Sequence, residues 1–210
     1  MKKYDDLGLT FIERDWPAIE QEIRKHVTDW SVCVQAGGHF GLYPLELSKM
    51  FAEVHTFEPY AENYVQLAEN CKERDNITCY LKALGAYVGT VDILHLEGGN
   101  SGMNITIPGD GVPAVTIDSL KLSSCGLIQL DIEQYELFAL MGAIETIEKF
   151  NPVIILESPA ATNNACNEIL WRLGYCLVGK AGQDSVFKYL GEMSAFKQQI
   201  AALRDKRRVL

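Results

Sequence analysis

Two acidic side chains stand where a strand-like segment ends, near the middle of the chain. Asp131 closes the apolar run 127–131, and Glu133 follows two residues later. In parallel α/β proteins, ligands bind in the crevice outside the carboxyl ends of the strands, so both carboxylates are placed to meet a ligand. They could bind a cationic group or serve as a general base. The alternative is a pair of acids that favours the dipole of the following helix.

A glycine-rich turn is the second feature with chemical meaning. Gly37, Gly38 and Gly41 separate an apolar segment at 31–36 from a helix-like segment at 43–50. Glycine lets the backbone approach a ligand at a helix N-terminus without a side-chain clash. The spacing does not fit the G-x-G-x-x-G dinucleotide fingerprint, and a tight turn without any ligand explains it equally well.

Glu58 favours the ligand interpretation of that turn. It ends the next apolar segment, 53–58. In doubly wound folds an acid at this position can accept hydrogen bonds from both ribose hydroxyls. A solvated surface glutamate is the alternative. Glu157 ends a later apolar segment and lies on the same expected rim as Asp131.

Strand-like and helix-like segments alternate along the chain and must position these residues. The alternation predicts βαβ units and a parallel sheet in one α/β domain. Asp15 is expected to cap the first helix, with Pro17 in its first turn. The expected strands are 31–36, 53–58, 77–81, 127–131, 152–157, 175–178 and 186–189, and the expected helices are 16–27, 43–50, 61–74, 136–150 and 163–173.

Two segments depart from this alternation. Residues 85–115 are rich in glycine and hold strand-like runs at 90–96 and 105–107. We predict an inserted hairpin and loop there, with 98–104 either a lid or an exposed loop. Residues 191–210 carry five bases and two acids and predict a basic amphipathic helix that packs on an acidic neighbour, in the same chain or across a dimer.

Composition limits the class of partner. The chain has 28 acids against 19 bases, a net charge of -9, which argues against binding through a nucleic-acid backbone. It holds no apolar run near the ~20 residues of a membrane span, and its N-terminus lacks a signal peptide, so we expect a cytoplasmic protein without a membrane partner. Six cysteines without a C-x-x-C pair predict free thiols, and the four histidines give no metal-ligand spacing, so no metal site is expected.

Seven short motifs, taken in order, resemble the FkbM-type S-adenosylmethionine-dependent methyltransferases. The resemblance covers roughly residues 31–190, and the order and spacing of the motifs make it specific. The motifs are Val34-Gln35-Ala36-Gly37-Gly38-His39-Phe40-Gly41, Phe57-Glu58-Pro59, Ala83-Leu84-Gly85, Thr116-Ile117-Asp118-Ser119-Leu120, Ile128-Gln129-Leu130-Asp131-Ile132-Glu133-Gln134-Tyr135-Glu136, Gly142-Ala143 and Pro152-Val153-Ile154-Ile155-Leu156-Glu157.

The resemblance implies a Rossmann-like class I methyltransferase fold, with a seven-stranded, mostly parallel sheet, an antiparallel last strand and helices on both faces. S-adenosylmethionine is the implied cofactor, and the implied acceptor is a hydroxyl group of a small molecule or carbohydrate. Asp131 and Glu133 would face the methyl-transfer side. The implied cofactor-binding residues are Gln35, Gly37, Gly38, His39, Phe40 and Gly41 around the methionine and ribose, Glu58 and Pro59 at the ribose, Ala83 and Leu84 by the adenine, and Asp131.

Two residues depart from the family pattern. Gln35 stands where the family usually has an acid, and Gln134 where it usually has glycine. Glutamine cannot offer a charge to the cofactor's ammonium group, although its carbonyl oxygen still accepts a hydrogen bond. We therefore expect Gln35→Asp to leave cofactor binding equal or tighter. Gln134 predicts an altered turn after the fourth strand.

The leading hypothesis is an O-methyltransferase in which Asp131 or Glu133 removes or orients the proton of the acceptor hydroxyl. A catalytically degenerate S-adenosylmethionine-binding module is the first alternative, motivated by the two glutamines. An NAD-binding Rossmann oxidoreductase is the second, and the glycine spacing speaks against it. We expect a single domain over 1–210, comprising an N-terminal helical segment at 1–30, the core and a basic C-terminal helix at 191–210. The core leaves little room for a substrate domain, so homo-oligomerisation stays open.

Overall fold

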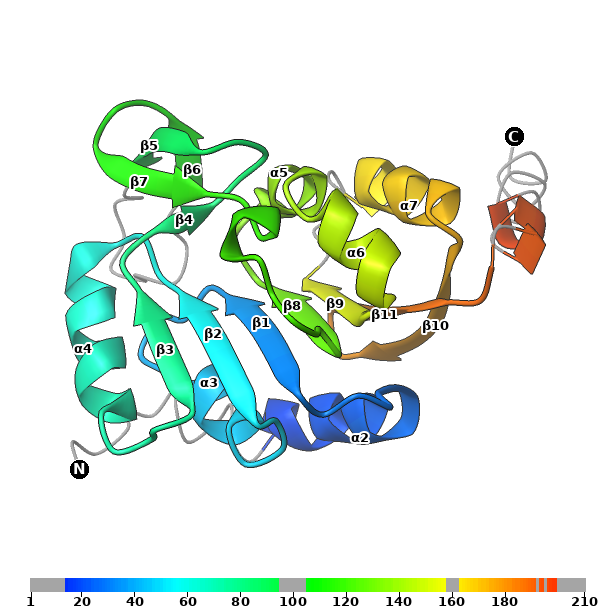
Figure 1. The fold of residues 1–210 in the computed structure, drawn as a ribbon, viewed down its shortest axis with the longest axis horizontal. Coiled ribbons are helices and arrows are strands. Elements are labelled where there is room, and N and C mark those ends of the chain that lie inside the picture. The colour runs from blue at the N-terminus through cyan, green and yellow to red at the C-terminus, as the bar shows by residue number, and fades with distance from the viewer. Residues whose placement is uncertain (1–13, 95–104, 158–162, 192, 195, 200–210) are drawn as a thin grey trace.

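The computed structural model describes residues 14–94, 105–157, 163–191, 193–194 and 196–199. A seven-stranded sheet lies between two layers of helices, and a smaller sheet stands beside one end of it (Figure 1). The elements, in chain order, are α2 (Trp16–His26), β1 (Val32–Ala36), α3 (Leu42–Leu47), β2 (Glu53–Phe57), α4 (Ala61–Cys71), β3 (Ile77–Tyr80), β4 (Ala83–Leu84), β5 (Gly89–Leu94), β6 (Ile105–Pro108), β7 (Val112–Val115), η3 (Asp118–Leu120), β8 (Leu127–Leu130), α5 (Glu136–Met141), α6 (Ile144–Phe150), β9 (Val153–Glu157), α7 (Asn163–Arg172), β10 (Tyr175–Ala181) and β11 (Asp184–Tyr189).

The large sheet has the strand order β10-β11-β9-β8-β1-β2-β3. Strands β3, β2, β1, β8 and β9 run parallel, and β11 runs antiparallel to both of its neighbours. This confirms the expected seven-stranded sheet with an antiparallel last strand. Strands β2 and β3 are added on one side of β1, and β8 and β9 on the other. The order of the strands therefore reverses between β1 and β8, and the carboxyl ends of these two parallel strands meet at a topological switch point.

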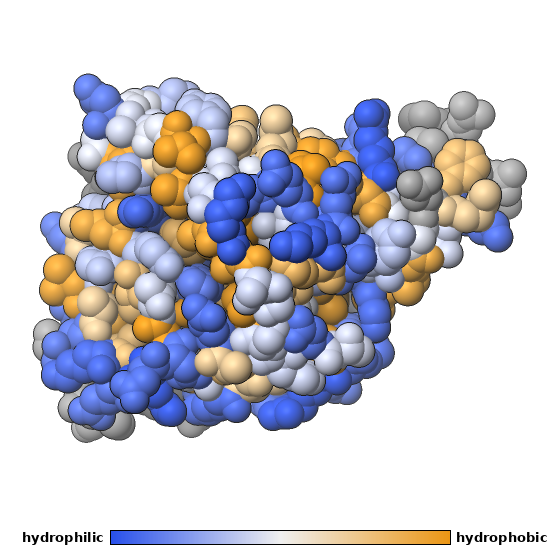
Figure 2. Space-filling model, viewed as in Figure 1, coloured by the Kyte–Doolittle hydropathy of each residue, from blue (hydrophilic) through white to orange (hydrophobic). Residues whose placement is uncertain are grey.

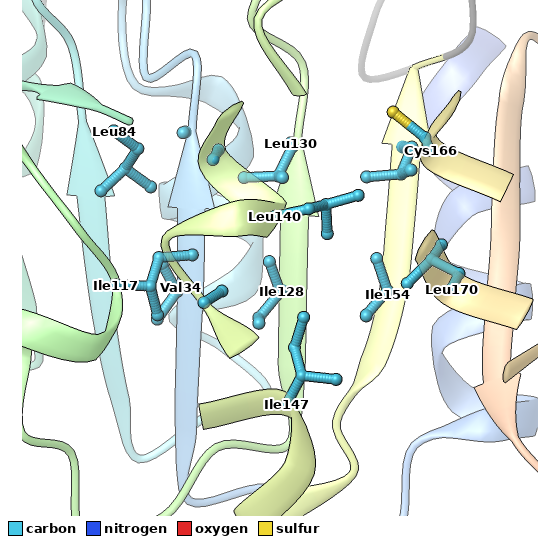
Figure 3. Close-up of a cluster of buried hydrophobic side chains, with 14 of the residues drawn as sticks. Val34, Leu84, Ile117, Ile128, Leu130, Leu140, Ile147, Ile154, Cys166 and Leu170 are labelled. Carbon is cyan, nitrogen blue, oxygen red and sulfur yellow. The ribbon is translucent and has the colours of Figure 1, made fainter. Parts of the chain in front are cut away.

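Successive residues of a strand point to opposite faces of the sheet. Both faces are apolar because most successive residues of the central strands are apolar and buried. Val34, Ile128 and Ile154 face α5, α6 and α7, where they pack against Leu140, Ile147, Cys166 and Leu170 (Figure 3). The opposite face carries Cys33, Val54 and Leu127 against the helix α2. All six cysteines are free thiols, as the sequence predicts.

The sequence predicts one helix over 136–150, but the structure has two, α5 and α6. A Cβ at Gly142 would overlap the carbonyl oxygen of Gly85, so the chain passes tightly against the end of β4 and the helix breaks. The side chain of Asp118 satisfies backbone N–H groups in the first turn of α6. Its Oδ1 accepts from the backbone N of Thr146 (2.8 Å), and its Oδ2 accepts from the backbone N of Glu145 (3.1 Å). Leu140 and Ile147 enter the same core, so hydrophobic periodicity continues across the break and conceals it.

The inserted segment forms a second sheet with the order β4-β7-β5-β6. The predicted pairing of β5 with β6 is confirmed. The sequence analysis missed β4, which has only two residues, and β7, which pairs with both β4 and β5. Residues 98–104, expected to form either a lid or an exposed loop, lie outside the described residues.

The two ends of the chain follow the predictions in part. Helix α2 has a proline in its first turn, as expected, but Asp15 makes no side-chain capping bond and pairs instead with Arg14 (2.7 Å). Near the other end, residues 193–194 and 196–199 have helical backbone, and residues 200–210 lie outside the described part. The amide of Gln198 pairs with the edge strand β10, accepting from Leu177 N and donating to Leu177 O, each at 2.8 Å.

Candidate active site

The glycine-rich turn crosses the carboxyl ends of β1 and β8 in a conformation that needs its glycines. Gly37 and Gly41 have φ of 85° and 96°, the left-handed region that glycine adopts without a Cβ penalty. A Cβ at Gly37 would overlap the carbonyl oxygen of Asp131, and a Cβ at Gly38 would lie 2.8 Å from Thr56 Oγ1. The turn therefore packs directly against the end of β8, where Asp131 follows.

Gln35 lies beneath this turn and does not face outward. It is fully buried; its Nε2 donates to the carbonyl oxygen of Gly37 (3.1 Å), and its Oε1 accepts from the hydroxyl of Thr56. Both ends of the amide are thus used within the protein. Gln35 braces the turn, and the expectation that an acid here would keep or improve binding does not follow from this arrangement.

Glu58 is held rigidly at the end of β2. Its Oε2 accepts from the backbone N of His39 (2.8 Å) and its Oε1 from that of Tyr60 (2.9 Å), and the side chain is 6% exposed. Burial raises the pKa of this carboxyl, and these backbone bonds oppose the rise. The side chain of Asn63 is a third donor to this carboxylate, which leaves one lone pair, enough for a contact with one ribose hydroxyl rather than the predicted two.

The other predicted cofactor residues surround the same strand ends in different ways. His39, with φ of 44°, stacks its ring on Phe40 at 3.8 Å between centroids. Ala83 and Leu84 form β4, and their side chains are buried in two hydrophobic clusters. Pro59 follows Glu58 and is partly exposed. Ala83 and Leu84 can therefore contact a ligand only through backbone atoms. The side chains of His39 and Phe40 are partly exposed and can contact a ligand themselves.

Asp131 and Glu133 meet Glu157, so that carboxylate oxygens from the three residues lie within 4.8 Å of one another. Burial and the neighbouring Glu157 hold the pKa of Asp131 well above its usual value. Burial and the same neighbour raise the pKa of Glu133 to about 7. Three oxygen ligands at this spacing are also a set that a hard divalent cation accepts. No metal was expected there, because the four histidines lack metal-ligand spacing.

The turn after β8 has an unusual backbone. Glu133 and Gln134 have φ of 51° and 75°, so two successive non-glycine residues adopt the left-handed region. This costs roughly 1–2 kcal/mol per residue. The altered turn predicted from Gln134 stays a prediction; Gln134 here has the left-handed backbone that glycine would favour.

Two further polar residues complete the site, and the sequence analysis assigned neither. Asp184 begins β11 opposite Glu157 and is 6% exposed. Its Oδ2 accepts from the hydroxyl of Tyr43 on α3 (3.1 Å), and burial raises its pKa to about 6. The turn Gly182-Gln183 could have revealed it, since a two-residue hairpin turn places the next residue in the returning strand.

The strand order, the glycine turn and the acid after β2 together define a Rossmann-like methyltransferase fold. Residues 35–177 match the family described as "Methyltransferase FkbM domain", and the chain belongs to this family. The chain therefore carries a methyltransferase domain, for which S-adenosylmethionine is the expected cofactor. Family membership favours this function over the nicotinamide-dependent alternative.

Solved structures share the fold at low sequence identity. The FkbM methyltransferase of Methylobacillus flagellatus KT aligns with a TM-score of 0.55 and 14% identity, over 89% of this chain and 56% of that one. The ribosomal protein L11 methylase of Lactobacillus delbrueckii subsp. bulgaricus gives 0.53 and 11%, over 89% and 80%. SMU.1697c of Streptococcus mutans, in complex with SAH, gives 0.50 and 9%, over 83% and 96%.

The chain thus spans just over half the length of the Methylobacillus protein. No curated protein matches it. None of the described helices is long and apolar enough to cross a bilayer.

Proposed function

We propose that the protein transfers the methyl group of S-adenosylmethionine to a hydroxyl group of a small molecule or carbohydrate. The cofactor supplies an activated methyl group on a sulfonium. Gly37, Gly38 and Glu58 would hold it against the ends of β1 and β2. The protein's own residues must then place the acceptor oxygen in line and accept its proton, and positioning of this kind supplies much of the rate.

The observation that carries the proposal is the state of Glu133. Its carboxyl is partly exposed beside Asp131 and Glu157, and its pKa is raised to about 7. A general base works best when its pKa lies near the working pH. Asp131 is shielded by its neighbours and touches the glycine turn, so we assign Glu133 as the proton acceptor and Asp131 to the cofactor side.

Exposed apolar side chains on α5 and in the segment between β4 and β5 support a small organic acceptor. The rings of Tyr135 and Phe138 lie 4.7 Å apart, and Phe138, Met141 and Tyr87 are 42%, 48% and 63% exposed. Hydrophobic residues are visible over the small sheet and beside α5 in Figure 2. Aromatic faces of this kind can contact an acceptor's apolar surface while its hydroxyl points to the acid.

The test is a methyl-transfer assay with S-adenosylmethionine and a panel of sugars, polyols and phenols, read by mass spectrometry of the acceptor. We expect methylation at oxygen, and we expect Glu133→Gln to lower turnover by about 10²–10⁴-fold. Glu145→Gln, an exposed acid on α6, is the matched control. Transfer to nitrogen or carboxylate acceptors alone, or full turnover by Glu133→Gln on its true acceptor, would refute the proposal.

A further inference from the structure

Two cysteines lie side by side where the helix α4 packs against the outer strand β3 (Figure 1). Cys71 is the last residue of α4, and Cys79 lies within β3. The connection between them is tight: the backbone N of Arg74 donates to the carbonyl oxygen of Cys71 (2.9 Å). The backbone N of Ile77 then donates to the carbonyl oxygen of Arg74 (3.1 Å). The chain thus turns at once from helix to strand, and a hydrogen bond joins the two thiols.

The two thiols differ in exposure and in acidity. Cys71 is buried, and its hydrogen bond to Cys79 and its burial both raise the pKa of its thiol, against the opposing charge of Arg74. Cys79 is partly exposed, and the hydrogen bond from Cys71 lowers the pKa of its thiol although burial opposes this. The thiolate is the reactive form of cysteine, so an oxidant reacts first with Cys79. The thiol of Cys71 already points at the sulfur that this reaction would modify.

The end of α4 that carries Cys71 also supports the glycine-rich turn. Nδ2 of Asn70 donates to the carbonyl oxygen of Phe40 (2.8 Å), which lies within that turn. A Cβ built at Gly41 would lie 3.2 Å from Sγ of Cys71, tighter than ordinary van der Waals contact. The Cys71 sulfur therefore packs directly on the turn. If this sulfur moves toward β3, the turn loses its contact at Gly41, and the hydrogen bond to Phe40 is displaced with the end of the helix.

We propose that Cys71 and Cys79 are an oxidation-sensitive pair, which hydrogen peroxide converts to a disulfide that weakens cofactor binding at the neighbouring turn. The thiolate of Cys79 attacks one peroxide oxygen and the O–O bond breaks; Cys79 becomes a sulfenic acid, and the hydroxide released takes up the proton that Cys79 had lost. The sulfur of Cys71 then attacks the sulfur of Cys79, the S–O bond breaks, and water leaves with the proton of Cys71. The two thiols are oxidised to one disulfide, and the peroxide is reduced to two waters. The effect on binding rests on the proposed cofactor site, whereas formation of the disulfide does not.

The experiment is treatment of the full chain with hydrogen peroxide, followed by blocking of the remaining thiols and digestion with trypsin without reduction. Trypsin cleaves after Lys72 and Arg74, so a disulfide between Cys71 and Cys79 joins two peptides that are otherwise separate. We expect mass spectrometry to show the joined peptides, and dithiothreitol to separate them. In calorimetric titrations the oxidised chain should bind S-adenosylhomocysteine about 5–30-fold more weakly than the reduced chain, and dithiothreitol should restore the affinity.

Substitutions of single cysteines provide the controls. Cys79→Ser should bind S-adenosylhomocysteine as the unaltered reduced chain does, and peroxide should neither join the peptides nor weaken binding. Cys176→Ser, on β10 at the opposite edge of the large sheet, should respond to peroxide as the unaltered chain does. If Cys79→Ser does not fold, Cys71→Ala serves in its place, and weakening of binding by peroxide in that variant would count against the disulfide.

The outcomes separate this inference from the proposed cofactor site. Oxidation of Cys79 to a sulfinic acid without any joined peptides would overturn the pair. A disulfide that leaves the affinity for S-adenosylhomocysteine unchanged would overturn its effect on the glycine-rich turn. No binding of S-adenosylhomocysteine to the reduced chain would overturn the cofactor site itself, while the joined peptides would still establish the disulfide.

Discussion

Replacing the buried amide of Gln35 by a carboxyl of the same size tests the geometry beneath the glycine turn. In Gln35→Glu the group that replaces Nε2 faces the carbonyl oxygen of Gly37, now 3.1 Å from that nitrogen. A protonated carboxyl can still donate to this carbonyl, but an ionised one cannot and is fully buried. Burial and the facing carbonyl therefore raise the pKa of the new group in the folded state.

The magnitude follows from this raised pKa. Below about pH 4 the carboxyl is protonated in both states, and the loss of stability is about 1 kcal/mol or less. As the pH rises, the unfolded chain ionises first, so the folded state binds more protons and stability falls by about 1.4 kcal/mol per pH unit until the folded pKa is reached. A pKa raised by two to three units, added to that first loss, thus gives a total loss of about 3–5 kcal/mol at pH 8.

The assay is urea unfolding at pH 5 and pH 8 of the unaltered protein, Gln35→Glu and Gln35→Met. The methionine variant removes both hydrogen bonds without adding a charge, and should lose about 1–3 kcal/mol equally at the two pH values. We also expect Gln35→Asp to bind S-adenosylhomocysteine more weakly, the reverse of the expectation from sequence. A loss in Gln35→Glu that does not change with pH would refute the buried contact with Gly37.

Three further substitutions test separate parts of the structure. Asp118→Ala removes the capping acceptor of α6 and should lower the free energy of unfolding by about 1–2 kcal/mol in urea titrations; Asp118→Asn, which keeps an acceptor oxygen, should lose less. Gln134→Gly relieves a residue at φ 75° and should raise that free energy by about 0.5–1 kcal/mol, and a decrease would contradict the left-handed backbone. Tyr43→Phe removes the donor that stabilises ionised Asp184, so the carboxyl pKa, about 6 at present, should rise further in an NMR titration; a lower pKa would contradict the 3.1 Å hydrogen bond.

Much of the fold follows from sequence pattern, because strands buried on both faces and amphipathic helices repeat along the chain. The strand ends that carry Gly37, Glu58 and Asp131 were predictable for this reason. The break between α5 and α6 was not, since it depends on the close approach of Gly142 to Gly85, far away in sequence. The two-residue strand β4 is likewise fixed by its pairing with β7 and has no pattern of its own.

In the candidate site, too, local sequence pattern predicted some features, and contacts between distant residues determined the others. Residues within local motifs were found, but their orientation depends on neighbours that no motif specifies. Gln35 looked like a ligand contact and turns inward, because Thr56 and Gly37 satisfy its amide. Asp184 belongs to no motif and joins the site because β11 returns antiparallel beside Glu157. Register between distant strands decided both outcomes.

The pairing of Gln198 with Leu177 bears on how copies of this protein stay apart. Strand β10 is an outer strand of the large sheet, and an open outer strand invites another chain to add itself there and begin aggregation. The glutamine amide accepts from and donates to one residue's backbone, as an added strand would. Gln198 therefore occupies, at Leu177, one of the backbone positions of this edge where an added strand would pair.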